Sequence, residues 1–118
     1  MNLMELFRHQ TDLQTLPAGH VLFNVGDQGD LMYVLMSGTA EVFVKNKLVE
    51  TAQPGAILGE MAMIDETTRS ATVVAKDNCT LLAIDRRRFD FLIQQTPHFA
   101  THVMRVMATR LRNTDRML

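Results

Sequence analysis

Cysteine is nearly absent from this chain of 118 residues, because Cys79 is the only one. A single thiol excludes an internal disulfide framework and any metal or iron–sulfur cluster that needs several cysteines. No apolar stretch reaches the roughly 18 residues of a membrane-spanning helix, and Glu5, Arg8 and His9 interrupt the start of the chain where a signal peptide would be apolar. We therefore expect a cytoplasmic protein without membrane contact, in which Cys79 is a buried free thiol.

The chain also lacks an excess of positive charge, since twelve Lys and Arg face thirteen Asp and Glu. Modules that bind nucleic acid usually gather basic residues on one face, so we expect no direct nucleic-acid binding by this chain. The basic run at 86–88 is flanked by Asp85 and Asp90, which favours a solvated first helical turn. His98 and His102 have a metal-binding spacing, but no third ligand is evident, so we predict no metal site.

Alternation with period two dominates the middle of the sequence. Val21, Phe23 and Val25 alternate with polar or small neighbours, and similar short runs follow as far as Ile84. Turn residues such as Gly26 and Asp27 separate these runs at close intervals. The pattern predicts a mainly β domain, built as a compact antiparallel sandwich, roll or barrel.

Helical periodicity replaces this alternation at both ends. Residues 1–10 predict a short amphipathic helix with Asn2 as its N-cap. After the strands, Asp85 is a good N-cap for one helix, and Thr96-Pro97 begins another. We expect this last helix to continue over 97–118.

The last helix carries two apolar stripes. Phe99, Val103 and Val106 form one, which we expect to pack on the strands. The other recurs at alternating steps of four and three, as in a coiled-coil seam, and comprises Ala100, Met104, Met107, Leu111, Thr114 and Leu118. The two stripes either form one broad face that docks within the chain, or the second stripe forms a homodimer through residues 97–118. We favour the homodimer.

Residues 58–73, LGEMAMIDETTRSATV, carry the candidate chemistry. A helical turn opening at Gly59 would offer free amides to an anion, and Arg69 and Ser70 would add a guanidinium and a hydroxyl. The lone carboxylate of Glu60 suits a sugar hydroxyl. Together these groups match a phosphorylated sugar. The competing interpretation is a surface ion pair between Glu60 and Arg69, worth about 0–1 kcal/mol.

This segment resembles the phosphate-binding cassette of cyclic nucleotide-binding domains, in which Gly-Glu-x-Ala precedes Arg-(Ala/Ser/Thr)-Ala-(Thr/Ser)-Val. The spacing of nine from Glu60 to Arg69 matches the variant of protein kinase A regulatory subunits and cyclic nucleotide-gated channels. Residues 16–23 and 26–38 resemble the opening strands of that family, and 85–118 resembles its B and C helices.

The resemblance implies a double-stranded antiparallel β-roll of the jelly-roll kind. An N-terminal helix, a short phosphate-binding helix and two C-terminal helices would flank it. We accordingly expect one domain over 1–118, with the N-terminal helix in 1–15 and the roll in 16–84. The cassette would occupy 58–73, and the B and C helices 85–118.

The resemblance also implies a role for each cassette residue. Glu60 would accept the ribose 2′-hydroxyl beside the Gly59 amide. The Ala62 amide would donate to the phosphate oxygens, and Arg69 would neutralise the phosphate charge. Ser70 would add its hydroxyl and backbone N–H.

Three further positions belong to the implied pocket. Met61 and Ala71 would line it, and Thr114 would contact the base across a dimer. The chain departs from the family pattern at Leu58, where an aromatic is common, and at Asp115, where catabolite activators carry Ser. Serine after the cassette arginine occurs in cAMP-binding activators, whereas Ser or Thr there is also associated with cGMP. We favour cAMP, with cGMP open.

We therefore predict a non-catalytic sensor that signals through movement of its C-terminal helices. The sequence has neither a nucleophile–base pair nor the His-x-His of cupin metalloenzymes, so we expect no enzyme activity and no cofactor besides the ligand cAMP or cGMP. An effector protein would be a further partner. The alternative is that the chain is the ligand-binding half of a catabolite activator-type transcriptional regulator.

Overall fold

The computed structural model describes residues 1–65 and 68–117, without the side chains of Thr114 and Met117. Its elements, in chain order, are α1 (Leu3–Leu6), β1 (Gln14–Leu16), β2 (Val21–Phe23), β3 (Met32–Ser37), β4 (Ala40–Val44), β5 (Lys47–Ala52), β6 (Ile57–Leu58), α2 (Met61–Ile64), β7 (Thr72–Ala75), β8 (Cys79–Ile84), α3 (Arg86–Gln95) and α4 (His98–Met117).

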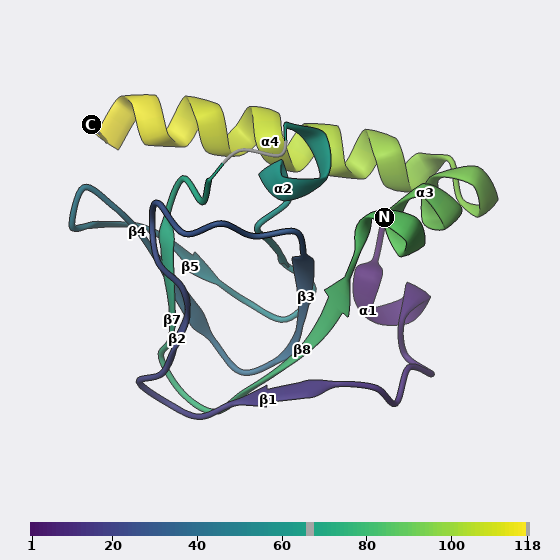
Figure 1. Cartoon of the computed structure of the whole chain (residues 1–118), viewed down its shortest axis with the longest axis horizontal. Coiled ribbons are helices and arrows are strands. Elements are labelled where there is room, and N and C mark those ends of the chain that lie inside the picture. Colours follow the sequence, from purple (N-terminus) through teal and green to yellow (C-terminus); the bar gives the residue numbers. More distant parts are fainter. Residues whose placement is uncertain (66–67, 118) are drawn as a thin grey trace.

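The strands form two four-stranded antiparallel sheets, in the orders β1-β8-β3-β6 and β2-β7-β4-β5. Figure 1 shows α4 lying lengthwise along one side of the strands, with α2 overlapping α4 in this view. The helices α1 and α3 lie together near one end of α4. The predicted antiparallel β-roll with flanking helices is therefore confirmed.

The hairpin of β4 and β5 forms the part of the roll that faces α4. Its two turn residues, Lys45 and Asn46, have φ of 53° and 63°. Two consecutive residues with positive φ are typical of the tight hairpin turn whose twist matches that of the strands. The resulting register pairs Val42 with Glu50, so both side chains lie on the same face of the sheet.

The N-terminal segment differs from the helix predicted over 1–10. The helix α1 covers only Leu3–Leu6, although Asn2 caps it as expected, by accepting a hydrogen bond from the Glu5 amide at 3.2 Å. Within 1–15 the structure also places most of β1, which pairs with β8. Long-range strand pairing therefore determines this segment, because an isolated single turn of helix gains little stability.

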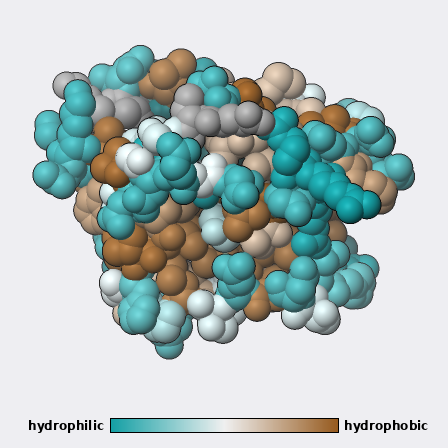
Figure 2. Space-filling view, viewed as in Figure 1, coloured by the Kyte–Doolittle hydropathy of each residue, from teal (hydrophilic) through white to brown (hydrophobic). Residues whose placement is uncertain are grey.

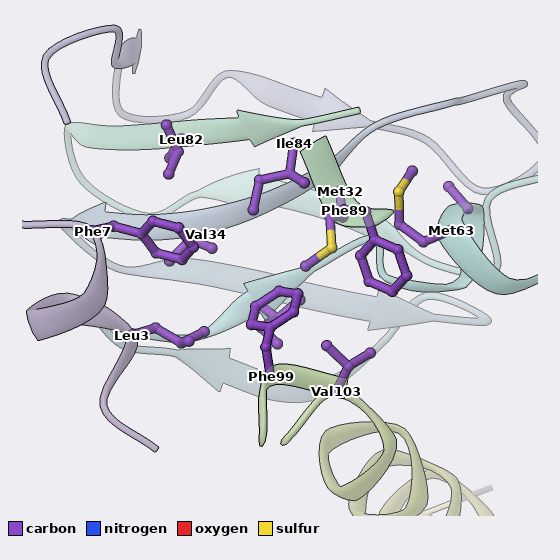
Figure 3. Close-up of a cluster of buried hydrophobic side chains, with 12 residues drawn as sticks. Leu3, Phe7, Met32, Val34, Met63, Leu82, Ile84, Phe89, Phe99 and Val103 are labelled. Carbon is purple, nitrogen blue, oxygen red and sulfur yellow. The ribbon is translucent and has the colours of Figure 1, made fainter. Parts of the chain in front are cut away.

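The helices meet the roll in one hydrophobic core (Figure 3). Phe99 of α4 is 0% exposed. Its ring lies edge-on to Phe7 at 6.4 Å and to Phe89 of α3 at 5.9 Å between ring centroids. Val103 is also buried there, and Val106 packs against the same cluster. The predicted docking of this stripe on the strands is confirmed.

The second stripe of α4 leaves part of its length uncovered. Met104 is 55% exposed and Leu111 is 66% exposed, whereas Met107 packs partly against the core. The predicted seam residues Thr114 and Leu118 lie outside the described side chains. The single broad docking face is therefore incomplete within one chain.

The remaining surface and the thiol fit an ordinary folded domain. Figure 2 shows apolar surface gathered over the strands below α4, beside hydrophilic side chains. No helix in the described part of the chain has the length and apolarity to cross a membrane. Cys79 is buried, as predicted, and its thiol donates to the carbonyl oxygens of Thr39 and Asp77. Burial raises the pKa of this thiol.

Candidate ligand site

The cassette begins where β6 leaves the core. Ile57 and Leu58 are buried and anchor the strand. The chain then turns at Gly59, whose φ of +74° is unfavourable for residues with a side chain. Glu60 is the N-cap residue of α2, and its side chain makes no capping bond there. The turn at Gly59 therefore leaves the Glu60 carboxylate available to groups beyond its own helix.

Arg69 is a buried cation, with 8% of its surface exposed. Its Nη2 donates to the Leu31 carbonyl at 2.8 Å and its Nη1 to the Gly59 carbonyl at 3.3 Å, while Nε is buried without a hydrogen-bond partner. The guanidinium also lies 4.1 Å from the centre of the Phe23 ring. Burial lowers the pKa of Arg69, against the attraction of Tyr33 and nearby aspartates.

No carboxylate among residues 1–65 and 68–117 forms an ion pair with Arg69. The surface ion pair between Glu60 and Arg69, the competing interpretation of the sequence, is therefore wrong. A buried charge without a counter-ion is costly, and an anionic ligand would relieve that cost.

Two glycines form the space that holds the guanidinium. A methyl group at Gly29 would lie 2.5 Å from Cζ of Arg69, and one at Gly59 would lie 2.6 Å from its Nη1. Real Cβ contacts are never so short, so only glycine fits while Arg69 keeps this position. The sequence identified Gly59 as part of the cassette, but it treated Gly29 as a turn residue.

A second arginine reaches the site from α4. Nη1 of Arg110 lies 2.8 Å from Oε2 of Glu60, whose side chain is 7% exposed. Nε and Nη2 of Arg110 contact the two carboxylate oxygens of Glu50 in β5, at 2.8 and 2.9 Å. Nη2 also donates to the Ile57 carbonyl. Arg110 thus connects α4, β5 and the cassette.

The electrostatics of Arg110 show how strongly it is held. Burial acts to lower its pKa, but the hydrogen bond to Glu50 and the charges of Glu60 and Glu50 outweigh it, and the pKa is raised. Sequence reasoning missed this residue. The available signal was its position four residues before Thr114, which places both on the same face of a helix.

Two adjoining cavities open beside these charges. The smaller, about 70 Å³, lies between Phe23, the cassette and Arg110. The larger, about 300 Å³, lies between the β4–β5 hairpin and α4. The residues that line both are Val42, Glu60, Met61, Ser70, Ala71 and Arg110. The smaller cavity is polar at the cassette, whereas Val44, Val49 and Met107 make the larger one mainly apolar.

Seven of the predicted site residues meet around the smaller cavity, namely Gly59, Glu60, Met61, Ala62, Arg69, Ser70 and Ala71. The Ala62 amide donates to the Gly59 carbonyl at 3.3 Å, which is long for such a bond and leaves the amide weakly engaged. The side chain of Thr114, predicted to contact the base, lies outside the described residues. Their individual roles in ligand binding stay predictions.

Comparison with known proteins identifies the family of the chain. A family model described as the cyclic nucleotide-binding domain matches residues 13–96, and the chain belongs to that family. The cyclic AMP receptor protein of Thermus thermophilus is 34% identical over 104 residues, which cover 84% of this chain and 48% of that protein. The cAMP-dependent protein kinase regulatory subunit of Eremothecium gossypii is 37% identical over 71 residues, covering 60% of this chain and 16% of that protein.

The solved structures agree with the fold. The catabolite activator protein of Thermus thermophilus superimposes with a TM-score of 0.80 at 29% identity, over 95% of this chain and 60% of that one. The chain spans about half or less of the length of the two curated relatives. The activities and partners of those longer proteins therefore do not follow for this chain from the match alone.

Proposed function

We propose that this domain is a non-catalytic cytoplasmic sensor that binds a cyclic nucleotide monophosphate and signals by moving its C-terminal helices. The observation that carries the proposal is the buried guanidinium of Arg69, which forms no ion pair among the described residues and lines the same cavity as the carboxylate of Glu60. A cyclic phosphodiester would bring one negative charge to Arg69, and its ribose would bring a 2′-hydroxyl to Glu60.

The larger cavity suits the base. Its apolar walls would cover the faces of a purine, while its volume of about 300 Å³ is at the lower end of the range for small-molecule sites. We propose cAMP as the preferred ligand, because two relatives are named for it. The second candidate ligand is cGMP, because a serine after the cassette arginine, here Ser70, is also associated with cGMP recognition.

Calorimetric titration of the purified chain with cAMP, cGMP and a cyclic dinucleotide tests this function. We expect saturable binding of one cyclic mononucleotide per chain, tighter for cAMP than for cGMP. The absence of binding to either mononucleotide would reject the proposal. Stronger binding of the dinucleotide would replace the proposed ligand class.

The glycine cradle gives a sharper test of the same site. Gly29→Ala adds a methyl group where the guanidinium of Arg69 lies, so the arginine side chain has to shift from its position in the cavity wall. We expect cAMP affinity to fall by about tenfold or more, the loss of one charge-assisted contact. Gly19→Ala is the control, since a methyl group there meets nothing within 4 Å. Gly19 has a φ of +84°, so its substitution adds backbone strain that Gly29→Ala lacks. A loss of affinity confined to Gly29→Ala therefore cannot come from such strain.

We also propose that α4 forms a homodimer through its second apolar stripe. Met104 is 55% exposed and lines none of the ligand cavities described above, so Met104→Glu would test the interface directly. Sedimentation should show a dimer for the native chain and a monomer for the variant, because a carboxylate would be buried in the seam. Thr109→Glu, which adds the same charge elsewhere on α4, should remain dimeric. A native monomer would contradict the proposal.

The alternative function is the ligand-binding half of a catabolite activator-type regulator, acting with a further output domain. The observation that favours it is coverage of only 48% of the cyclic AMP receptor protein. Mass spectrometry of the protein from its native cells would decide, because a mass well above that of these 118 residues requires additional segments. An effector protein is the partner that the stand-alone sensor would need.

A further inference from the structure

Glu50 stands at an unusual place in the wall of the site. It lies opposite Val42 in the β4–β5 pair, on the face that also carries the paired residues Ala40 and Ala52. Val42, Ala40 and Ala52 are buried apolar residues. The Glu50 side chain is 30% exposed, so its carboxylate loses part of its hydration, which is costly unless a partner compensates it. Its placement therefore needs an explanation beyond the fold of the sheet.

Arg110 supplies that compensation. Its guanidinium makes more contacts with Glu50 than with Glu60. Two of its nitrogens contact both oxygens of Glu50, at 2.8 and 2.9 Å, and one contacts Glu60, at 2.8 Å. A bidentate pair fixes the plane of a guanidinium, whereas a single contact does not. The Ile57 carbonyl accepts a further bond from Nη2, but the two contacts to Glu50 make it the main carboxylate partner of Arg110, and Glu60 accepts a single bond from Nη1.

This sharing matters for the carboxylate of Glu60. A carboxylate offers about four lone-pair positions, and Arg110 uses one of those on Glu60. Without the Glu50 charge, the strongest remaining partner of Arg110 would be Glu60 itself. Arg110 would then either form a second bond to Glu60 or lose its fixed orientation. Both changes reduce the ability of Glu60 to accept a hydroxyl.

We propose that Glu50 is a positioning residue for ribose recognition. It holds Arg110 so that the guanidinium orients Glu60 through one bond and leaves its other lone pairs to the ribose 2′-hydroxyl. The inference rests on the proposed function, since it concerns the same cyclic nucleotide site. It adds a residue of β5, outside the cassette, to the group that recognises the sugar.

The test compares cAMP with 2′-deoxy-cAMP on the native chain and on Glu50→Gln, by calorimetric titration. In the native chain, removing the 2′-hydroxyl should weaken binding by about tenfold or more, as expected for a hydrogen bond to a charged group. In Glu50→Gln we expect weaker cAMP binding with nearly unchanged 2′-deoxy-cAMP binding. The ratio of the two dissociation constants should therefore fall toward one.

The matched control is Glu41→Gln. Glu41 lies in the adjacent strand β4 and pairs with Thr51, so its side chain points to the opposite face from Val42 and Glu50. The substitution is chemically identical and should leave the native ratio unchanged. Glu50→Asp keeps the charge but shortens its reach, and an intermediate ratio is expected. It also carries the test if Glu50→Gln does not fold.

The outcomes separate this inference from the proposed function. An unchanged ratio in Glu50→Gln and Glu50→Asp overturns the positioning role. Equal weakening of both nucleotides also overturns it, because a purely structural defect would not depend on the 2′-hydroxyl. Failure of the native chain to bind any cyclic mononucleotide rejects the proposed function itself, and that result appears before any variant is made.

Discussion

Arg69→Met should weaken cAMP binding by about 10- to 150-fold while leaving the unliganded domain about as stable as the native one. The affinity falls because the phosphate loses its charge-assisted partner. The stability holds because two effects offset each other. The variant loses the hydrogen bonds to the Leu31 and Gly59 carbonyls and the contact with the Phe23 ring, but it also removes a buried charge that forms no ion pair with a described carboxylate. Replacement of a buried charge by an apolar side chain of similar length is often neutral or stabilising.

Thermal unfolding with and without saturating cAMP measures both effects at once. A ligand that binds only the folded state raises the melting temperature, so the native chain should show a clear shift and Arg69→Met almost none. Arg87→Met is the matched control, because Arg87 is exposed on α3. An equal ligand-induced shift in Arg69→Met and the native chain would exclude Arg69 as the phosphate partner. A large fall in the unliganded melting temperature would contradict the account of its burial.

The parts of the fold that local patterns determine were predictable. The last strand ends at Ile84, where the alternating runs were predicted to end, and Asp85 caps α3 by accepting from the Arg88 amide at 2.8 Å. The start of the chain was not predictable in the same way. Gln14–Leu16, of which only Leu16 is apolar, become a strand because β8 offers them an open edge. Nothing in their own sequence specifies that pairing.

The same contrast applies to the site. The cassette is contiguous, so its residue types and spacing could be recognised together. Arg110 and Glu50 are 60 positions apart and meet only when α4 lies along the roll. Gly29 likewise contacts Arg69 only through the folded chain. Sequence patterns therefore identified the cassette residues that line the smaller cavity, and the structure added the groups that hold them.

The core beneath α4 links the cassette to the C-terminal helices. Ala62 and Met63 of α2 belong to the same buried cluster as Phe89 of α3 and Phe99 of α4. A displacement of α2 on ligand binding would change the packing of both helices, since close-packed interiors accommodate little free movement. This shared core is the physical basis for the proposed signal, and Phe99 lies at its centre in Figure 3.

Phe99→Ala should destabilise the domain by about 3–5 kcal/mol, because it removes a fully buried ring and leaves a cavity. It also removes the edge-on contacts with Phe7 and Phe89. The loss is a large part of the roughly 5–15 kcal/mol that stabilises an ordinary domain. Denaturant unfolding at one temperature, with cAMP absent, gives the free energy directly.

Phe91→Ala is the matched control for this effect. Phe91 lies on α3 and is 59% exposed, so its removal should change the free energy of unfolding by less than about 0.5 kcal/mol. Similar losses in the two variants would show that the packing of α4 on the roll is not the main source of stability. A large loss confined to Phe99→Ala would place the anchor of α4 at this ring. The helix that carries Arg110 to the ligand site would then depend on a core contact eleven residues earlier in the chain.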